Sequence, residues 1–378
     1  MLPLIFDTDE HITEPPDFWT SRMSKKWGSR VPHVVDDDEW GQAWTYDDVL
    51  IRPFGLQSVG SEDPRKIGPV KSYNDIDPAC FEPKARIDIL ERDGIGAALI
   101  FPSILGSCSV IRDDELYVDC VKTYNDALWD WCQEGDPKRL YPVAQVPAIG
   151  VEHAMGELRR AAKKGFTSYA FNQWPGGGAT PTEADEPFWS LLEETGMTMA
   201  FHGAGAGRPK APPMPEAKDG RQDVKRSLGQ AQEMIAAGRA AGLSSTVHLA
   251  MFILTGVLER HPKLKIGLIE TSAGWLPAFG ERLDEAYLHH RFLVEDRLKK
   301  LPSEYLKEFR LNFDREWMGP KYRDVIGLDN LMYGTDYPHI GGFYPHSRFY
   351  IELLFHDAPQ DEVEKILWGN AFKIFGKN

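Results

Sequence analysis

Four acidic and imidazole side chains follow short apolar segments at widely separated places in the chain. Asp9 and His11 come after the apolar segment LIFD at positions 4–7, and they share one face of an extended backbone. His202 ends the segment TMAFH, and Asp336 lies in LMYGTDYPH, just past another apolar segment. Carboxylates and imidazoles are ligands that zinc, manganese and iron take in proteins. This set predicts a divalent metal site.

Each of these residues also has a structural explanation when it is taken alone. An acidic turn after a strand is commonly a solvated loop, and a histidine at a strand end is commonly a core residue. Asp336 could simply cap the helix that follows it. Three separate strand ends that each present a metal-binding group make coincidence the weaker explanation, so we expect ligation.

The elements that must position these residues are repeated β/α units. Apolar segments bounded by turn residues predict eight strands, at 4–7, 97–101, 141–146, 167–171, 198–202, 265–270, 310–313 and 331–334. Helical patterns lie between them, for example at 83–92, 115–132, 151–164 and 187–194. The alternation predicts an α/β barrel, in which residues after the strands build the active-site face.

Two segments interrupt the alternation, at Pro32–Tyr73 and Gly203–Asp223. They follow the first and fifth expected strands, so we expect loop insertions on the active-site face of a single domain that spans 1–378. The first insertion is rich in aromatic residues, which either cover the pocket as a lid or bury a subunit interface: Trp40, Trp44, Tyr46 and Phe54.

Composition excludes several classes of function. The 378 residues carry a formal net charge of -14, which disfavours binding to nucleic acid or to anionic lipid. The four cysteines form no CxxC pair and no dense framework, as is typical of a reducing cytoplasm. Neither a signal peptide nor an apolar run long enough to span a bilayer is evident. We therefore expect a cytoplasmic enzyme.

Longer motifs add a family resemblance. The motif around Asp9 with its following EPP, the stretch GVLERHPKLKIGLIETSAGWLPAFGERLDEAY, the segment GTDYPH and the closing ILWGNAFKIFG occur in that order. In this the chain resembles the amidohydrolase-related metal-dependent enzymes similar to aminocarboxymuconate semialdehyde decarboxylase. The resemblance implies a distorted TIM (β/α)8 barrel and a metal ion held by Asp9, His11, His202 and Asp336. It also implies a homo-oligomer, with a hetero-oligomer containing a homologue as the alternative.

The chain departs from the family pattern at two positions. The pair after the first strand is often His-x-His in the family and is here Asp9 and His11, and an anionic ligand favours manganese or iron over zinc somewhat. At the end of the sixth strand, where decarboxylases of the family typically have a histidine, this chain has Glu270. A decarboxylation mechanism that relies on that histidine is therefore disfavoured.

Glu270 has three possible roles. It could take a proton from metal-bound water, bind a second metal ion, or form a buried carboxylate hydrogen-bonded to the backbone. His248 either orients substrate or packs in the core, and Glu14 is either a ligand or a cap or salt-bridge residue. A carboxylate-rich set could supply ligands for two ions: Asp9, His11, Glu14, His202, His248, Glu270 and Asp336.

Further residues are expected around the metal. His339 is a candidate to support a ligand by hydrogen bonding. Arg208, Asn172 and Trp174 follow expected strands, where a carboxylated or aromatic substrate would sit, and an arginine suits a carboxylate through paired hydrogen bonds.

Several functions fit these residues. The first hypothesis is a hydrolase that uses metal-activated water on a small organic ester, amide or lactone, with Glu270, His248 or Asp336 in catalytic roles. The alternatives are a nonoxidative decarboxylase of an aromatic or unsaturated carboxylic acid, a dinuclear iron- or manganese-dependent oxygenase, and a catalytically silent structural subunit.

Overall fold

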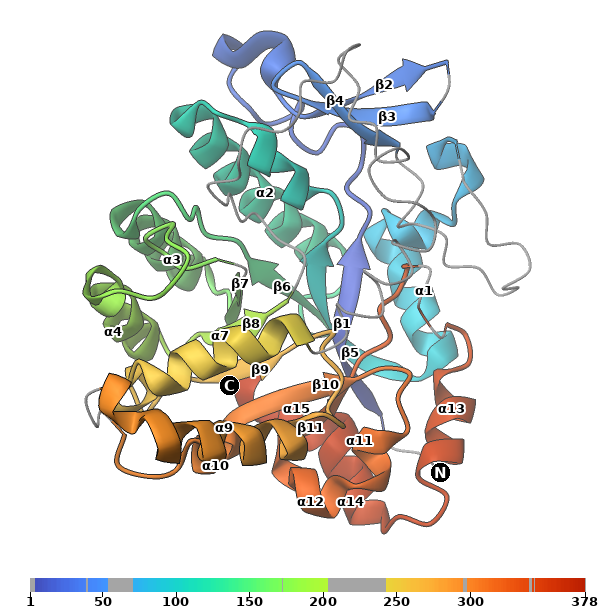
Figure 1. Ribbon diagram of the computed structural model, residues 1–378. Coiled ribbons are helices and arrows are strands. Elements are labelled where there is room, and N and C mark those ends of the chain that lie inside the picture. Colours follow the sequence, from blue (N-terminus) through green and yellow to red (C-terminus); the bar gives the residue numbers. More distant parts are fainter. Residues whose placement is uncertain are drawn as a thin grey trace.

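The computed structural model describes residues 4–38, 40–53, 71–171, 173–202, 243–294, 298–339, 342 and 344–377. Its main element is a sheet of eight parallel strands that pair in chain order. They are β1 (Ile5–Ile12), β5 (Ile95–Pro102), β6 (Leu140–Ala144), β7 (Ser168–Phe171), β8 (Thr198–Phe201), β9 (Ile266–Leu268), β10 (Phe309–Phe313) and β11 (Leu331–Tyr333). A bridge between Glu10 and Tyr337 joins β1 to the segment after β11, so the strands form a nearly closed barrel (Figure 1).

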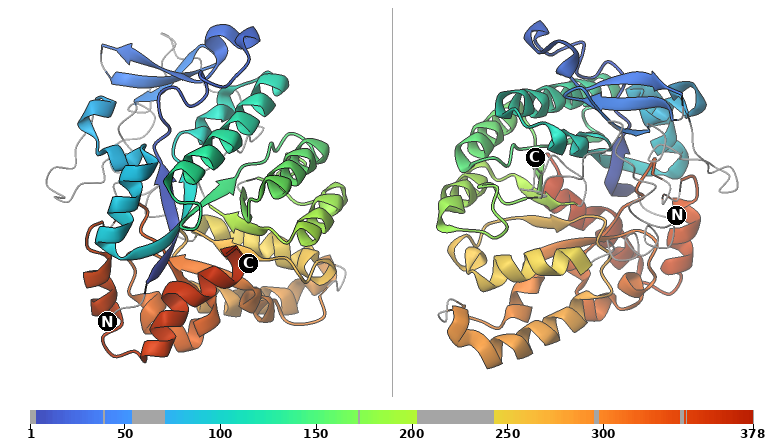
Figure 2. Two further views of the ribbon diagram at one scale, coloured as in Figure 1. Left: turned by 180° about the vertical axis from the view of Figure 1, so that it is seen from behind. Right: turned by 45° about the horizontal axis from the view of Figure 1, so that its top comes forward.

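Helices alternate with the strands and surround them (Figure 2). Glycines end three of the described helices in left-handed conformations, at Gly94, Gly165 and Gly196, as the sequence pattern indicates. The described helices are α1 (Pro83–Asp93), α2 (Asp114–Gly135), α3 (Val151–Lys164), α4 (Glu186–Thr195), α7 (Leu243–Leu254), α8 (Val257–Arg260), α9 (Leu276–His290), α10 (Pro302–Tyr305), α11 (Met318–Lys321), α12 (Arg323–Ile326), α13 (Ser347–Leu354), α14 (Gln360–Glu364) and α15 (Asn370–Phe375). The expected TIM barrel is confirmed.

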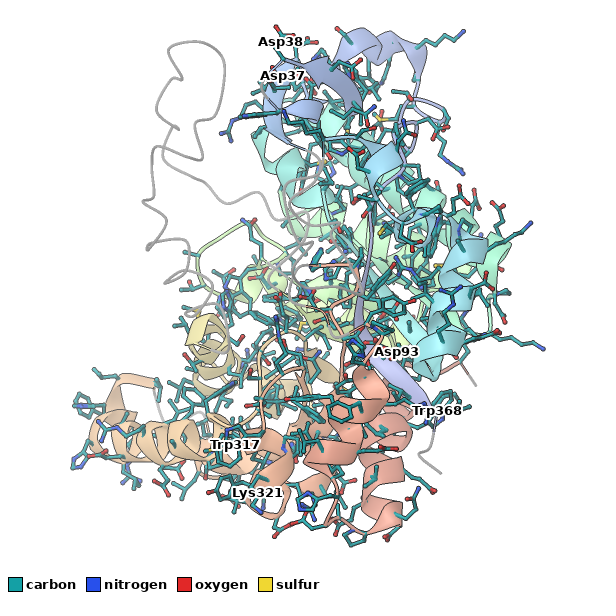
Figure 3. All side chains as sticks on the ribbon, turned by 90° about the vertical axis from the view of Figure 1, so that its right-hand side faces the viewer. Asp37, Asp38, Asp93, Trp317, Lys321 and Trp368 are labelled. Carbon is teal, nitrogen blue, oxygen red and sulfur yellow. The ribbon has the colours of Figure 1, made fainter. Side chains whose placement is uncertain are left out.

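The barrel has its own apolar core, separate from the layer between strands and helices. This inner core takes side chains from the strands together with Ile374 and Phe375 of α15. Trp368, just before α15, packs its ring 5.6 Å from that of Phe6 and lies by the N-terminal end of β1 (Figure 3). The C-terminal segment therefore covers one end of the barrel and leaves the other for the polar residues of β1.

β1 continues five residues beyond the expected strand, to Ile12, so Asp9 and His11 lie within the strand and not after it. The polar residues of β1 keep an extended backbone because neighbouring segments form hydrogen bonds with their side chains. Asp7 accepts hydrogen bonds from the backbone and hydroxyl of Thr335, at 3.0 and 2.5 Å. Thr8 donates to the carbonyl of Tyr333 at 2.9 Å. These contacts close the barrel between its first and last strands.

We expected the first insertion to be a loop, but it contains an antiparallel sheet. The strands of this sheet are β2 (His33–Asp37), β3 (Gly41–Tyr46) and β4 (Val49–Pro53). The sheet lies beyond the C-terminal end of β1 (Figure 1). Asp47 and Asp48 make the hairpin turn with positive φ angles of 53° and 60°. Two aspartates between alternating apolar and polar residues are a signal for such a turn that the sequence analysis missed.

Trp44 and Tyr46 of this sheet are buried, with their rings 5.5 and 5.8 Å from that of Trp19. The Trp19 indole donates in turn to the Cys120 carbonyl of α2 at 3.0 Å. Trp44 and Tyr46 therefore anchor the insertion to the barrel, and for these two residues burial within the fold replaces both expectations, the lid and the subunit interface. The ends of the insertion are described, but Phe54 lies outside the described residues.

The second insertion, at 203–223, also lies outside the described residues, together with Arg208 and Asn172. Within the described ranges, no helix combines the length and apolar character needed to cross a membrane.

Candidate metal centre and active site

The segment after β11 brings Asp336 to the ligand pair on β1. The backbone amide of Asp336 donates to the carbonyl of Asp9 at 2.7 Å, and the amide of His11 donates to the carbonyl of Tyr337 at 2.7 Å. Because side chains alternate along a strand, Asp9 and His11 project from the same side of β1. Asp336 lies beside both of them as a result.

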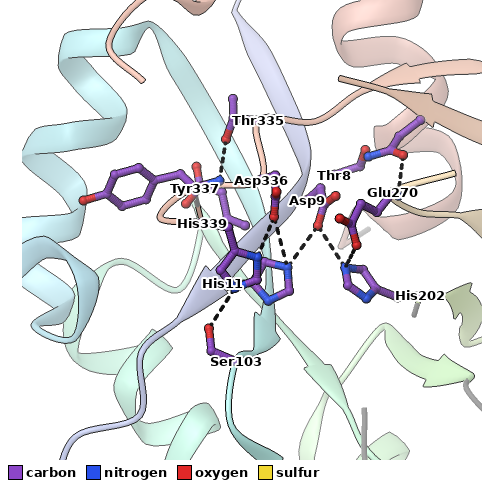
Figure 4. A network of polar contacts seen from close by, with 12 residues as sticks. Thr8, Asp9, His11, Ser103, His202, Glu270, Thr335, Asp336, Tyr337 and His339 are labelled. Atoms are coloured by element: carbon purple, nitrogen blue, oxygen red, sulfur yellow. Dashed lines mark hydrogen bonds and ion pairs between the residues drawn. The ribbon is translucent and has the colours of Figure 1, made fainter. Parts of the chain in front are cut away.

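The four expected ligands converge in one cluster (Figure 4). Oδ1 of Asp9 lies 3.3 Å from Nε2 of His11 and 3.2 Å from Nε2 of His202. Nε2 of His11 lies 3.6 Å from Oδ1 of Asp336. Two overlapping groups could hold a metal ion, namely Asp9 with His11 and His202, and His11 with Asp336 and His339. The cluster is thus able to hold a divalent ion.

Hydrogen bonding within the cluster fits a metal ion. Nδ1 of His11 lies 2.8 Å from the carbonyl of Pro102, and because a carbonyl only accepts, Nδ1 must carry the proton. Nε2 then keeps its lone pair and can bind a metal ion. Nε2 of His11 and Oδ2 of Asp9 are buried and make no hydrogen bond to the described residues. Buried polar atoms without partners are costly, and a bound cation would satisfy both.

Ligation needs neutral imidazole and ionised carboxylate, which the pKa values of His11 and Asp9 favour, whereas those of His202 and Asp336 are both raised. Burial acts to raise the pKa of Asp9, but the neighbouring His202 and His11 hold it well below its usual range. Burial lowers the pKa of His11 to about 4. Burial, followed by the charge of Asp9, raises the pKa of Asp336 to about 7. A cation between these carboxylates would relieve their repulsion.

His339 supports Asp336 as expected. Its Nδ1 lies 2.7 Å from Oδ1 of Asp336, and its Nε2 lies 3.1 Å from the hydroxyl of Ser103 (Figure 4). Its ring stacks on that of His11 with centroids 3.8 Å apart. Ser103, which the sequence analysis did not single out, therefore helps to orient the imidazole next to Asp336.

Glu270 follows β9 and borders the cluster. Its Oε2 lies 3.9 Å from Nε2 of His202, and its side chain is 41% exposed, whereas that of Asp336 is 4% exposed. Burial and the charge of Asp336 raise its pKa to about 8. The backbone amide of Glu270 donates to Asn312 at 2.6 Å. Of the expected site residues that the structure describes, Glu270 is the carboxylate open to solvent.

The backbones of Glu270 and Asp336 are both left-handed, with φ angles of 55° and 60°. This conformation is uncommon for residues with a side chain and typically costs on the order of 1 kcal/mol or more. Neighbouring segments hold it, through the hydrogen bonds to Asn312 and to the carbonyl of Asp9. Strand direction alone would not predict where these two carboxylates point.

His248 is partly buried on α7 among aromatic rings. Its ring lies 5.0 Å from that of Phe201, 5.8 Å from Trp174 and 6.0 Å from Phe171. Trp174 itself is only 1% exposed and packs against Phe252 at 4.8 Å. The structure thus packs His248 against these three aromatic rings, of which Trp174 is itself a core residue.

Glu14 is fully buried and lies in neither metal-binding group. Its Oε1 and Oε2 both accept from the backbone amide of Ile104 at 3.1 Å, and Oε1 accepts from Leu105 at 3.3 Å. The structure therefore favours the capping role for Glu14 over ligation. A carboxylate three residues past His11 could not be assigned to one role from spacing.

Replacing Glu14 with glutamine is expected to alter how stability depends on pH. Burial raises the pKa of Glu14 to about 7, so its contribution to folding is present below about pH 4.5 and is lost as the pH rises through 7. Between pH 5 and 8 the Glu14→Gln variant should gain stability relative to the parent, by up to about 1.4 kcal/mol per pH unit. Urea unfolding across this range measures the difference. Glu91→Gln, at a carboxylate that is 64% exposed, is the control and should show no such trend.

A buried arginine, which the sequence analysis did not identify, positions the end of β1. Arg86 of α1 is fully buried and donates to Oε2 of Glu10 at 2.9 Å, to the carbonyl of His11 at 2.8 Å and to the carbonyl of Ala79 at 2.8 Å. Its guanidinium also lies 4.8 Å from the ring of Tyr337. A charged residue on the inner face of an amphipathic helix was the available signal.

Replacing Arg86 with methionine should destabilise the protein by about 3–5 kcal/mol, because Glu10 is left as a buried carboxylate without its partner. Urea unfolding at pH 7 measures the loss. The double variant Arg86→Met/Glu10→Gln should recover part of it, since the unpaired charge is gone. A loss below about 1 kcal/mol in the single variant would show that Glu10 does not depend on Arg86.

Comparisons with known proteins agree with this fold. An amidohydrolase from Mycobacterium avium subsp. paratuberculosis K-10 has 20% sequence identity, and the match covers 100% of this chain and 99% of that chain with a TM-score of 0.74. The 5-carboxyvanillate decarboxylase from Sphingomonas paucimobilis has 19% identity, with 99% of each chain covered and a TM-score of 0.66. At these identities the similarity establishes the fold.

A third structure is that of a dihydroxybenzoic acid decarboxylase from Polaromonas sp. JS666 with bound manganese and the inhibitor 2-nitroresorcinol. It has 18% identity, and the match covers 99% of this chain and 97% of that chain with a TM-score of 0.63. The family model described as amidohydrolase matches residues 9–377, from the first expected ligand almost to the end of the chain. The resemblance inferred from the motifs is thereby confirmed, and the chain belongs to the amidohydrolase family.

Proposed function

We propose that this protein is a metal-dependent hydrolase of a small organic ester, amide or lactone, with Glu270 as the general base. The position of the Glu270 carboxylate carries the proposal. It borders the buried ligand cluster at 3.9 Å from His202, and it is 41% exposed. A carboxylate in this position can reach both the ion-binding cluster and a substrate that arrives from solvent.

The proposed roles follow from the contacts. When bound by Asp9, His11, His202 and Asp336, a divalent ion supplies Lewis acidity, which activates water and polarises a carbonyl group. Glu270 accepts the proton of the attacking water and returns it to the leaving group. His339 and Ser103 hold Asp336 in place through the contacts at 2.7 and 3.1 Å.

Manganese or iron is the proposed ion. Asp9 gives the site an anionic oxygen ligand where family members often have a neutral histidine, and oxygen ligands suit harder ions. The similar decarboxylase from Polaromonas sp. JS666 was solved with bound manganese. Elemental analysis of protein purified without added metal tests this choice, and zinc as the sole metal would contradict it.

The hydrolytic activity is tested with 4-nitrophenyl acetate and with a panel of lactones and amides. Activity should disappear after chelation, return when manganese is added, and persist without oxygen. His11→Ala protein serves as the control for hydrolysis at other sites. Hydrolysis that is insensitive to chelation, or turnover that requires oxygen, would contradict the proposal.

A second candidate function is nonoxidative decarboxylation of an aromatic carboxylic acid. The aromatic surroundings of His202 favour it. Phe101 stacks on the His202 ring with centroids 4.6 Å apart, and Phe201 precedes His202 in the chain. Both rings are buried, and they give the ligand cluster apolar surroundings of the kind that suit an aromatic substrate. Several similar structures are of decarboxylases that act on aromatic acids, by their names.

Carbon dioxide release separates the two candidates. A decarboxylase would release carbon dioxide from 2,6-dihydroxybenzoate or 5-carboxyvanillate without consuming oxygen, and Glu270 would then protonate the ring carbon. A hydrolase would release none from either compound. The same metal-loaded preparation serves both assays, so a failure of one assay cannot be attributed to inactive protein.

A further inference from the structure

Arg315 follows β10 and reaches the edge of the metal centre. Its Nη2 lies 3.9 Å from Oδ2 of Asp336, which is the last expected ligand in the chain. Its Nε and Nη2 both donate to Oδ2 of Asp314, at 3.1 and 2.9 Å. Asp314 therefore holds one edge of the guanidinium in place.

The loop that carries Arg315 is tied to the loop that carries Glu270. Glu316 accepts from the backbone amide of Gly274 at 3.1 Å and also from that of Ala273. Asn312, at the end of β10, accepts from the amide of Glu270 at 2.6 Å. Arg315 and Glu270 are thus presented by two adjoining loops that are fixed to each other at the same end of the barrel.

The other edge of the guanidinium is open. Within the described ranges, Nη1 of Arg315 has no hydrogen-bond partner, and the side chain is 43% exposed. The Nη1 and Nη2 edge of a guanidinium presents two parallel N–H groups, which match the two oxygens of a carboxylate. An arginine held at one edge and open at the other loses little conformational freedom when it binds an anion.

Charge supports an anionic partner. Asp9, Asp336, Glu270 and Asp314 lie in and beside the ligand cluster, and their negative charges would repel a carboxylated molecule that had no cationic partner. Among the described residues, Arg315 is the arginine that pairs with Asp314 and lies close to Asp336, so an acidic substrate group would be drawn to its open edge.

We propose that Arg315 binds a carboxylate of the substrate, so that the preferred substrate is a carboxylated ester, amide or lactone. The inference rests on the proposed hydrolase and specifies its substrate class. The scissile carbonyl would lie near Glu270 while the free carboxylate pairs with the Nη1 and Nη2 edge. No carboxylate of the substrate would then need to approach Asp314.

The competing explanation is that Arg315 only positions Asp336 as a metal ligand. Loss of Arg315 would then lower the metal content and slow all substrates equally. Recognition of a substrate carboxylate predicts instead an effect that depends on substrate charge, with the metal content unchanged. The two explanations therefore differ in the ratio of kcat/KM for a carboxylated substrate to kcat/KM for a neutral one.

The test compares mono(4-nitrophenyl) glutarate, which carries a carboxylate, with neutral 4-nitrophenyl butyrate on metal-loaded protein. The parent should prefer the glutarate ester, and Arg315→Met should lower kcat/KM for that ester by about 10- to 100-fold, mainly through KM. The neutral ester should change less than about threefold. Arg315→Lys should restore part of the preference because it keeps the charge.

Arg22→Met is the matched control, since Arg22 is 39% exposed and pairs with one carboxylate, Asp130. It should leave both esters and the metal content unchanged. An equal loss for both esters in Arg315→Met, or an equal rate for both in the parent, would overturn the inference while leaving the hydrolase standing.

Calorimetric titration with glutarate gives a second readout that needs no turnover. Metal-loaded parent should bind glutarate at least tenfold more tightly than Arg315→Met. If neither ester is hydrolysed but this difference is observed, the hydrolase fails and the anion site stands. If glutarate binds both proteins equally, the anion site is wrong.

Discussion

Replacement of His11 by alanine is expected to abolish metal retention and to lower kcat/KM by more than the roughly 100-fold that loss of an outer hydrogen-bonding partner produces. His11 belongs to both groups that could hold an ion, and its Nε2 is buried without another partner among the described residues. The carbonyl of Pro102 fixes the tautomer in which Nε2 of His11 keeps the lone pair that binds an ion. Elemental analysis after dialysis, together with steady-state kinetics, measures both effects.

His356→Ala is the control, because His356 is exposed after α13 and contacts the carbonyl of Leu353 at 3.1 Å. It should keep the parent metal content and rate. A His11→Ala protein that still holds one equivalent of metal would contradict the assignment of this cluster.

Replacement of Glu270 by glutamine is expected to reduce kcat by about 100- to 10000-fold, the usual contribution of a general base or acid. Glutamine keeps the shape and the hydrogen-bonding oxygen but cannot take the proton. Metal content should stay the same, because Asp9, His11, His202 and Asp336 remain. Elemental analysis and kcat from the same preparation are the measurements.

Glu285→Gln, at a side chain that is 55% exposed on α9, is the matched control and should be silent. If Glu270→Gln loses metal in step with its activity, Glu270 is a ligand and not a base. A variant that keeps both metal and full kcat would exclude either role. The metal content thus decides between the roles left open by the sequence.

The parts of the fold that follow from periodicity were predictable. Apolar segments and amphipathic helices gave all eight strands of the barrel, because hydrophobic patterns report directly on burial. Asp9, His11, His202 and Asp336 were brought together as expected, since strand ends of a parallel barrel meet at one face. The cluster itself is therefore a consequence of topology.

Polar groups buried by distant partners were not predictable in the same way. β1 continues through its acidic residues because Thr335 and Arg86, far along the chain, satisfy Asp7 and Glu10. By its spacing Glu14 is a possible ligand, and only the fold shows that the amides of Ile104 and Leu105 donate to it. A single sequence does not indicate which of several neighbours a buried carboxylate will meet.

Conformational details also escaped the sequence. The left-handed backbones of Glu270 and Asp336 are set by hydrogen bonds from other segments, and residue type gives no sign of them. Trp44 and Tyr46 have the aromatic character of a lid, yet a hairpin turn at Asp47 directs them into the core. Nothing in the sequence distinguishes Arg315 from the other arginines, and its proximity to Asp336 follows from its position after β10.

The closure of the barrel between β1 and β11 has a consequence for biosynthesis. Asp9 on β1 is made before the seven other strands of the barrel, and Asp336 is made only after the last of them, β11. A nascent chain can present the β1 pair but not the full ligand set, so stable metal capture must wait for the last β/α unit. Chains that terminate early would lack both the closing strand and a complete site, and would remain metal-free targets for proteolysis.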